Sequence, residues 1–286
     1  TWGADGWGSA SSETAGGGTL RLWSQDNFGE DLIFNQRDGF VFYWDKSNGL
    51  STRAQNLIEL SDAAPTISRK VIVSERDRHV ICFGANPIGQ ATQDRLLIRF
   101  SSQENPFFWT PTATNTAGDL RVGTGSEIVN AVKTRREIIV LTDTSVHSMQ
   151  FIGPPFTFGI NQLASNITVR GFNSAVAVGD AVFWMGYDRF YIYDGRVQVI
   201  PCSVRDHVFQ DFNETQFNKV YAGVNSAFGE VFWFYPSQTN SISNGGTGEN
   251  DKYVVYNYDQ KIWYVGSLAR SSWIDRGVYQ YPMATD

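Results

Sequence analysis

The sequence predicts an all-β fold, on three observations: a dense run of short apolar segments, the recurrence of that run along the chain, and a composition suited to a large packed core. The run is clearest at residues 176–201, VAVGDAVFWMGYDRFYIYDGRVQVIP, where turn signals separate the segments. Glycine and aspartate supply the backbone conformations that tight hairpins need. No segment is long enough for a helix, so the pattern is typical of a β-meander.

Both faces of this meander are apolar. Side chains alternate across a strand, so Ala181, Phe183 and Met185 would lie on one face of the sheet. Val182 and Trp184 would lie on the other face. A sheet that is apolar on both faces must be packed on both.

The same unit recurs five times, as an apolar strand, a charged turn, a second strand, an aspartate and an alternating third strand. The copies cover residues 19–44, 70–100, 128–151, 175–200 and 220–265. The five aspartates, which we call the pivot aspartates, are Asp38, Asp94, Asp143, Asp188 and Asp251. They lie roughly 50 residues apart once a polar loop at 236–250 is set aside, the length of a four-stranded propeller blade. We therefore predict a β-propeller of five to six four-stranded blades.

The domain organisation follows from this repeat. Residues 1–18 are rich in glycine, serine and alanine around Trp2 and Trp7, and we expect a loop or extended segment there. Residues 19–286 are the predicted propeller domain, whose last repeat begins at 273–279 and stays incomplete. The chain starts without an initiator methionine or signal-peptide pattern, so we expect a piece of a longer polypeptide.

Helix is expected at two places only. Residues 51–60 fit an outer strand or a short helix, and residues 204–217 carry apolar residues at helical spacing. Less than about a tenth of the chain should therefore be helical.

Two connecting segments have distinctive compositions. Gly153-Pro154-Pro155-Phe156 predicts an extended corner, because a residue before proline avoids the helical region. Residues 237–250, SQTNSISNGGTGEN, have almost no apolar content and should form a solvent-exposed insertion within the fifth copy.

Composition bounds the function classes. Apolar residues make up 42% of the 286 residues and aromatic residues 14%, which is ample for a large core. The formal net charge is −6, with no run of like charges, so neither a basic nucleic-acid groove nor a disordered acidic tail is indicated. No apolar stretch reaches the length of a membrane span.

The usual catalytic and metal-binding motifs are missing from the sequence. His79, His147 and His207 are isolated, without the spacing of zinc or copper ligands. Cys82 and Cys202 lie in or beside apolar strands, where we expect free thiols. Residues 123–127, GTGSE, lack the lysine of a phosphate loop and precede a strand, so we expect a hairpin turn there.

The pivot aspartates allow two interpretations. A ring of carboxylates at a propeller mouth could form a glycosidase or cation site. Alternatively, each carboxylate accepts backbone N–H groups of its own turn. Recurrence at equivalent positions favours the second interpretation, because catalysis needs two or three distinct groups rather than five copies.

Four segments resemble a known family. They are LRLWSQDNFGEDL at 20–32, NPFFWTP at 105–111, GTGSEI at 123–128 and the stretch from FWMG to YDG at 183–195. These segments resemble virion structural proteins of tailed bacteriophages, in the group of tail nozzle or hub, tail tubular and packaged-DNA stabilisation proteins.

The resemblance implies a propeller that assembles with identical subunits into a ring in the phage tail, between the portal and adaptor and the tail fibre or spike proteins. It implies a virion location, retention of packaged double-stranded DNA and a passive channel for its ejection. It implies no enzyme activity and no catalytic, cofactor-binding or metal-binding residues. Acidic net charge suits such a channel, because it weakens non-specific binding to phosphates.

Two other function classes remain open. A carbohydrate-binding or glycoside-hydrolysing propeller would use the many tryptophans and tyrosines and the pivot carboxylates, although the S-x-D-x-G-x-x-W box is absent. A cellular interaction propeller is the other class, although no Gly-His and Trp-Asp signature repeats.

Overall fold

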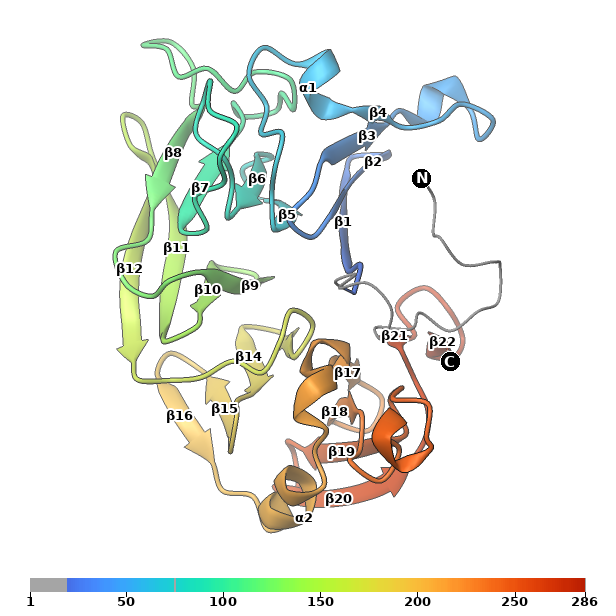
Figure 1. Cartoon of the computed structure of the whole chain (residues 1–286). Helices are drawn as coiled ribbons and strands as arrows, with labels where there is room; N and C mark the ends of the chain where they lie inside the picture. The colour runs from blue at the N-terminus through green and yellow to red at the C-terminus, as the bar shows by residue number, and fades with distance from the viewer. Residues whose placement is uncertain (1–19, 75, 286) are drawn as a thin grey trace.

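Consecutive antiparallel sheets make up nearly all of the computed structural model, which describes residues 20–74 and 76–285. Within these residues there are five four-stranded sheets and one two-stranded sheet, and the strand order in each follows the sequence. In Figure 1 the sheets, which we number in chain order, follow one another around a ring, from blue through green to orange. The expected loop at residues 1–18 lies outside the described residues.

The strands have the following bounds. Sheet 1 contains β1 (Trp23–Phe28), β2 (Asp31–Gln36), β3 (Val41–Trp44) and β4 (Gln55–Asn56). Sheet 2 contains β5 (Lys70–Val73), β6 (Val80–Phe83), β7 (Leu97–Phe100) and β8 (Gly118–Arg121). Sheet 3 contains β9 (Ile128–Lys133), β10 (Ile138–Thr142), β11 (Ser145–Gly153) and β12 (Thr157–Ser165). Sheet 4 contains β13 (Ala175–Val178), β14 (Ala181–Met185), β15 (Phe190–Tyr193) and β16 (Val197–Ile200).

Sheet 5 and the C-terminal hairpin complete the order. Sheet 5 contains β17 (Tyr221–Asn225), β18 (Glu230–Tyr235), β19 (Lys252–Asn257) and β20 (Ile262–Ser267). The C-terminal hairpin contains β21 (Ser272–Ile274) and β22 (Met283–Thr285). The short helices are η1 (Lys46–Asn48), α1 (Leu57–Leu60), α2 (Arg205–Gln210), η2 (Glu214–Lys219) and η3 (Ile242–Asn244).

The first strand of every sheet lies toward the centre of the ring. β1 contacts β5, and the contacts continue from β5 to β9, from β9 to β13, from β13 to β17 and from β17 to β21. This arrangement is a β-propeller, so the predicted fold class is confirmed. Strands account for 44% of the residues and helices for 8%, in agreement with the expected low helix content.

Each pair of neighbouring sheets encloses its own apolar core. β14 illustrates this, because Phe183 and Met185 pack toward sheet 5 and Val182 and Trp184 pack toward sheet 3. The alternation read from the sequence therefore becomes burial on both faces. Burying one such side chain contributes about 1.5–3 kcal/mol, so the four enclosed junctions dominate the stability of the fold.

Among residues 20–74 and 76–285, the ring has one open junction, between sheet 1 and the C-terminal hairpin. The outward face of sheet 1 carries Trp23, Phe34 and Phe42, with the Phe34 and Phe42 rings stacked at 5.2 Å between centroids. We call these three residues the open face of sheet 1, and Trp23 is 49% exposed. The C-terminal hairpin packs on sheet 5 instead, where Trp273 stacks on Phe232 at 5.4 Å.

Several local expectations are met and others need correction. Helix occurs at 205–210 and 214–219. Both lie in the predicted 204–217 region, except that the second helix extends two residues beyond it. Residues 51–60 contain both expected alternatives, since strand β4 runs directly into α1. The predicted extended corner at 153–156 is wrong beyond Gly153, because Gly153 ends β11 and residues 154–156 form the hairpin turn to β12.

The insertion at 237–250 is only partly solvent-exposed, contrary to expectation. Ser237, Ser241 and Asn250 are buried. Asn250 Nδ2 donates to the carbonyl oxygens of Lys219 and Arg270. The loop is therefore held by hydrogen bonds at its ends. The prediction was wrong because a polar composition excludes apolar burial but does not exclude burial through hydrogen bonds.

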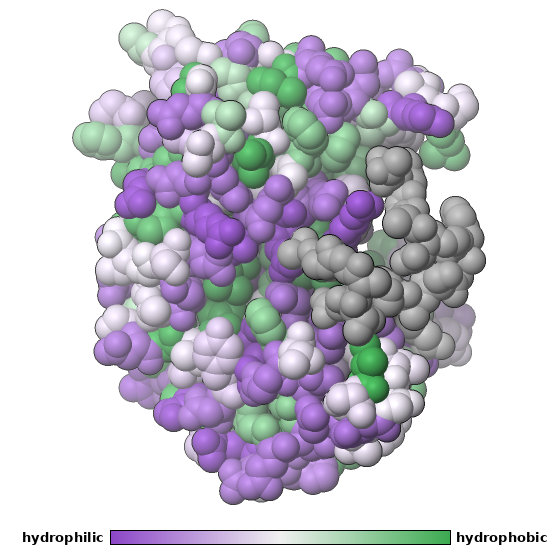
Figure 2. Space-filling view, in the orientation of Figure 1, coloured by the Kyte–Doolittle hydropathy of each residue, from purple (hydrophilic) through white to green (hydrophobic). Residues whose placement is uncertain are grey.

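Figure 2 shows hydrophilic and hydrophobic residues interspersed over the visible face of the ring. Within residues 20–74 and 76–285, no helix has the length and apolarity needed to cross a bilayer.

Candidate functional site

The five pivot aspartates occupy one topological position. Each lies in the connection between the second and third strands of its sheet, from sheet 1 to sheet 5. The equivalence inferred from the repeat is thus a structural one. Their environments differ, however, and fall into two groups.

Three pivots accept backbone N–H groups from nearby loops. Asp143 accepts the backbone N–H of Ser126 at 2.8 Å and its hydroxyl at 2.6 Å. Asp251 accepts the same two groups of Ser237 at 2.8 and 2.7 Å. Asp94 accepts the N–H of Leu96 at 3.0 Å. Asp94 also pairs with the Arg121 guanidinium at 2.7 Å. These carboxylates fasten turns, as the second interpretation expects.

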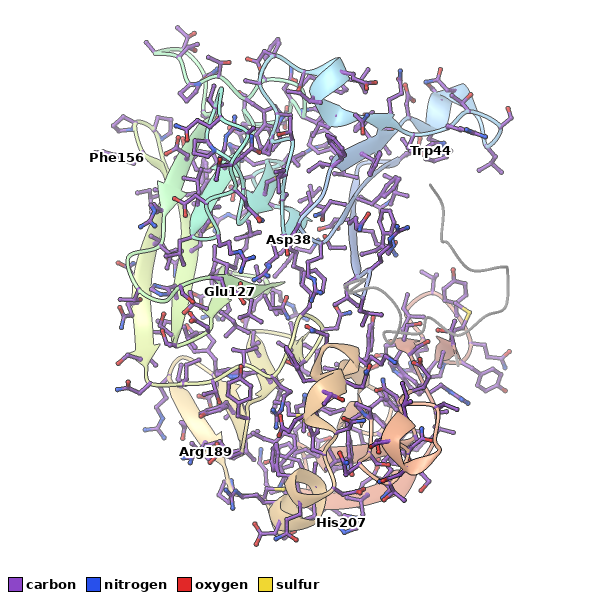
Figure 3. The ribbon with its side chains drawn as sticks, viewed as in Figure 1. Asp38, Trp44, Glu127, Phe156, Arg189 and His207 are labelled. Carbon is purple, nitrogen blue, oxygen red and sulfur yellow. The ribbon has the colours of Figure 1, made fainter. Side chains whose placement is uncertain are left out.

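The remaining two pivots bind guanidinium groups. Asp188 is exposed and accepts from Arg189 at 2.6 Å and, more weakly, from Arg205 at 3.5 Å. Asp38 lies near the centre of the ring in Figure 3, whereas Arg189 lies toward its lower edge. Asp38 also adopts a left-handed backbone conformation, with φ of 58°. The pivots therefore do not form one ring of equivalent ligands.

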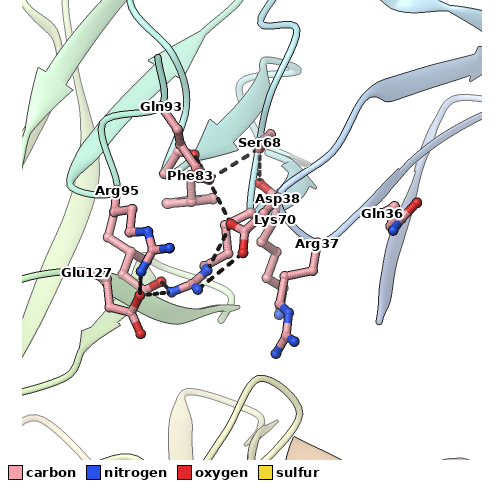
Figure 4. Close-up of polar contacts among 12 residues, drawn as sticks. Gln36, Arg37, Asp38, Ser68, Lys70, Phe83, Gln93, Arg95 and Glu127 are labelled. Carbon is pink, nitrogen blue, oxygen red and sulfur yellow. Dashed lines mark hydrogen bonds and ion pairs between the residues drawn. The ribbon is translucent and has the colours of Figure 1, made fainter. Parts of the chain in front are cut away.

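Around Asp38 the structure gathers a charged group that we call the axial cluster, shown in Figure 4. Its members are Arg37, Asp38, Arg69, Arg95 and Glu127. Arg69 Nε lies 3.2 Å from Asp38 Oδ1, and Arg69 Nη1 lies 2.7 Å from Glu127 Oε2. Arg95 Nη1 reaches the same Glu127 oxygen at 2.8 Å. The cluster joins turns of sheets 1, 2 and 3.

Arg37 extends this connection across the axis. Its Nη1 donates to Asn218 Oδ1 at 2.8 Å, which links sheet 1 to the segment before sheet 5. Burial, followed by repulsion from Arg69, lowers the pKa of Arg37. Burial raises the pKa of Asp38, but hydrogen bonds from Gln93 and Arg69 outweigh burial, so the net pKa is lowered. Both groups remain charged near neutral pH.

The axial cluster can stabilise but has no free acid–base pair. Each carboxylate already accepts from a guanidinium, and proton transfer at neutral pH requires a group whose pKa lies near that pH. Its chemical role in this arrangement is to hold the inner turns together. Breaking such a partly buried pair leaves an uncompensated charge, which is costly.

The histidines do not converge. His207 lies on α2 at the lower edge of the ring in Figure 3. His79 is buried against Phe100 and Phe158, and burial lowers its pKa to about 4. His147 Nε2 lies 2.9 Å from the hydroxyl oxygen of Ser145. Among the described residues, no group of three histidine, cysteine, aspartate or glutamate side chains could hold a metal ion.

Sequence reasoning missed the Ser145–His147 contact. A Ser-x-His spacing on a strand places both side chains on one face, so the signal was present. Ser145 is 1% exposed and His147 4% exposed, and Thr124 and Thr142 supply further hydroxyl contacts. The pair is sealed from solvent and fastens the turn between β10 and β11.

The remaining sequence candidates are structural. Cys82 and Cys202 are free thiols, as expected, and burial raises their pKa values to about 12 and about 11. Residues 123–127 precede strand β9, as expected, but they connect sheets 2 and 3 instead of closing a hairpin. Trp109 from the 105–111 segment is buried and donates to the Pro106 carbonyl at 2.7 Å.

Comparison with known proteins supports the fold and goes no further. No protein-family model and no curated protein matches the chain. Among solved structures, the chain is similar to the extracellular domain of BT4673 from B. thetaiotaomicron, named as a hybrid two component system. That likeness has a TM-score of 0.54 and 9% identity, and it covers 93% of this chain and 30% of the other.

A computationally designed protein, Ika8, gives a second likeness. Its TM-score is 0.50 at 8% identity, and the match covers 88% of this chain and 64% of the designed one. The chain thus spans about a third of BT4673's crystallised domain and under two thirds of Ika8. At these identities the likeness shows a shared propeller architecture.

Proposed function

We propose that the chain is a ring-forming structural subunit of a phage tail, of the nozzle or hub type, with a passive DNA channel between subunits. The resemblance of segments 20–32, 105–111, 123–128 and 183–195 to that family supports the assignment. The propeller architecture agrees with the architecture of the family. The virion location, the portal, adaptor and fibre partners and the retention of DNA belong to this proposal.

One observation carries the structural side of the proposal. Two carboxylates of the axial cluster, those of Asp38 and Glu127, share the guanidinium of Arg69. Saturated groups of this kind resist deformation but offer little to a substrate. A subunit that must keep its shape while DNA passes requires such fastening.

An unpaired apolar surface supports self-association. Trp23 and Phe40 are 49% and 50% exposed on sheet 1, and Tyr281 and Met283 are 69% and 46% exposed on the C-terminal hairpin. Clustered exposed apolar side chains mark interaction surfaces in soluble proteins. In the proposed ring, these two surfaces flank the open junction and contact neighbouring subunits head to tail.

The charge of the chain supports a passive channel. A net charge of −6 on each subunit repeats around the ring and opposes the DNA phosphates. The effect is modest, because charges beyond about 8 Å are largely screened at physiological salt. Weak repulsion lets DNA pass, whereas a cationic wall would bind it through counterion release.

The test combines oligomeric state with DNA binding. Sedimentation velocity and negative-stain electron microscopy of the purified chain should reveal closed rings, and Trp23→Asp should dissociate them. Phe156→Asp is the matched control, because Phe156 is 72% exposed on sheet 3, far from the open junction. A monomer at all concentrations that is also absent from purified virions would refute the assignment.

DNA binding tests the passive channel separately. Duplex DNA in about 0.15 M salt should bind the free protein weakly or undetectably. Sub-micromolar binding under these conditions would contradict a passive channel while leaving the ring intact.

A carbohydrate-active propeller is the competing proposal. Asp94, Asp143 and Asp251 bind backbone N–H groups of nearby loops, which gives it little support, because paired glycosidase carboxylates face a shared sugar. Turnover or saturable binding in a glycan screen would favour it over the tail assignment.

A further inference from the structure

The axis of the propeller contains a cavity that the proposed function does not use. Its volume is about 520 Å³, within the range of small-molecule sites, and it is partly open to solvent. The innermost strands β13, β17 and β21 form one side, and Lys70, Asn130 and Asn173 form the other. Strand β13 contributes all four of its residues, which are half-buried.

Lys70 places a half-buried cation at this cavity. It follows Arg69 directly, so the two side chains leave the strand on opposite sides, Arg69 to the axial cluster and Lys70 to the cavity. No ion pair within the described residues involves Lys70, whose Nζ lies 5.4 Å from the Phe172 ring centroid. Burial lowers the pKa of Lys70 to about 8, and Asp26 partly offsets that effect.

The neighbouring amide adds a second unmatched donor. Asn130 is 1% exposed, and its Oδ1 accepts from Lys70 Nζ at 2.5 Å and from the Ala131 backbone N–H at 2.8 Å. Among the described residues, Nδ2 of Asn130 has no hydrogen-bond partner. A buried donor without an acceptor is costly, so this end of the cavity has an excess of N–H groups.

Other charges around the cavity do not supply the missing acceptor. Asp26 lies 2.8 Å from Lys133 and also accepts the Val73 backbone N–H. Asp275, at the far end, accepts backbone N–H groups of Ser226 and Arg276. Burial raises the pKa of Tyr221, so that phenol stays neutral where Lys70 titrates.

We propose that the axial cavity binds a small organic monocarboxylate. The carboxylate accepts from Lys70 Nζ. It also accepts from Asn130 Nδ2 once the side-chain amide of Asn130 has rotated. A single half-buried ammonium matches one negative charge better than the two of a phosphate. The apolar body of the ligand lies against Ala175, Ala177 and Trp273, which line the cavity.

Calorimetric titration of the full chain with phenylacetate, benzoate and 3-methylbutanoate tests the site. At least one carboxylate should bind saturably at pH 7, with at least about tenfold weaker binding of the matching amide. Lys70→Met should weaken carboxylate binding at least about tenfold. Lys46→Met is the control and should have no effect, because the Lys46 side chain is 54% exposed and lies outside the cavity.

A second readout uses the unmutated protein, in case Lys70→Met does not fold. Bound carboxylate should raise the pKa of the Lys70 ammonium, followed by NMR, and affinity should fall as the pH rises through about 8. Equal binding of acid and amide would overturn the proposal. So would failure of all three carboxylates at about 10 mM, or tighter binding of inorganic phosphate.

Discussion

The junction between sheets 2 and 3 and the open face of sheet 1 both carry apolar side chains. These side chains are buried in the junction and half-buried or exposed on the open face. In the enclosed junction, Phe100 is 2% and Phe158 3% exposed, and their rings meet edge to face at 4.9 Å. On the open face, Trp23 is 49% exposed, although Phe34 lies 6.0 Å from it. Apolar patterning on both sides of a sheet therefore specifies a surface that requires a partner, and topology decides whether the same chain supplies one.

The largest difference should appear on removing one aromatic ring inside the enclosed junction. Phe158→Ala should reduce the free energy of unfolding by about 3–5 kcal/mol, because it leaves a cavity among buried rings. Urea denaturation followed by tryptophan fluorescence measures this. Phe156→Ala, two residues earlier and 72% exposed, should change stability by less than about 0.5 kcal/mol. Similar losses for both variants would contradict the described burial.

A smaller loss of stability is expected where ion pairs, and not apolar contacts, hold the inner turns of neighbouring sheets together. Arg69→Gln leaves Asp38 and Glu127 without their shared guanidinium and should cost about 2 kcal/mol. Arg189→Gln, at a side chain 47% exposed, should cost less than about 0.5 kcal/mol. Chemical denaturation of both variants at pH 7 makes the comparison.

The pH dependence of the same variant gives an independent check. The folded pKa of Asp38 lies below its usual 3.8, so its contribution is present above that value and is lost as the pH falls through the folded pKa. The unmutated protein should therefore lose more stability than Arg69→Gln on acidification below about pH 4. Parallel stability curves would show that Arg69 does not set the pKa of Asp38.

On the open face, the folded monomer should lose little. Trp23→Ala should reduce the free energy of unfolding of the dissociated subunit by about 1 kcal/mol or less, because the ring is 49% exposed and, within the described residues, meets two aromatic rings. Its effect on self-association should be larger than its effect on folding. Denaturation at a concentration below assembly separates the two, and a loss above about 3 kcal/mol would mean that the face is enclosed in solution.

The smallest effect is expected in a segment ordered by hydrogen bonds alone. Replacing residues 242–247 with a two-residue turn, while keeping Ser237 and Asn250, should lower the melting temperature by only a few degrees. Replacing Asn250 by Ala should cost more than this shortening, because its amide binds two carbonyls. Thermal denaturation followed by circular dichroism ranks the two variants, and the reverse order would place the stability in the tip.

The sequence predicted the features that repeat. Short alternating segments, turn residues and the recurring aspartate were sufficient for the propeller and for the position of Asp38, Asp94 and the other pivots. Local pattern could not reveal that Arg69 binds both Asp38 and Glu127. Arg69 and Glu127 directly precede the second and third copies, and they meet Asp38 of the first copy only when the inner turns converge. The cavity beside Lys70 was equally invisible, since it depends on small residues of β13 facing a distant strand.

The order of contacts around the axis has a mechanical consequence. Within the described residues, no strand of the C-terminal hairpin pairs with sheet 1, so the sheets form a horseshoe and not a closed hoop. In an open arrangement, small rotations at each sheet junction add up and change the distance between the first and last sheets. A closed propeller resists such rotations. The hydrogen bond from Arg37 to Asn218 acts as a tie across the opening. Loss of this hydrogen bond would therefore remove one link between sheet 1 and the segment before sheet 5.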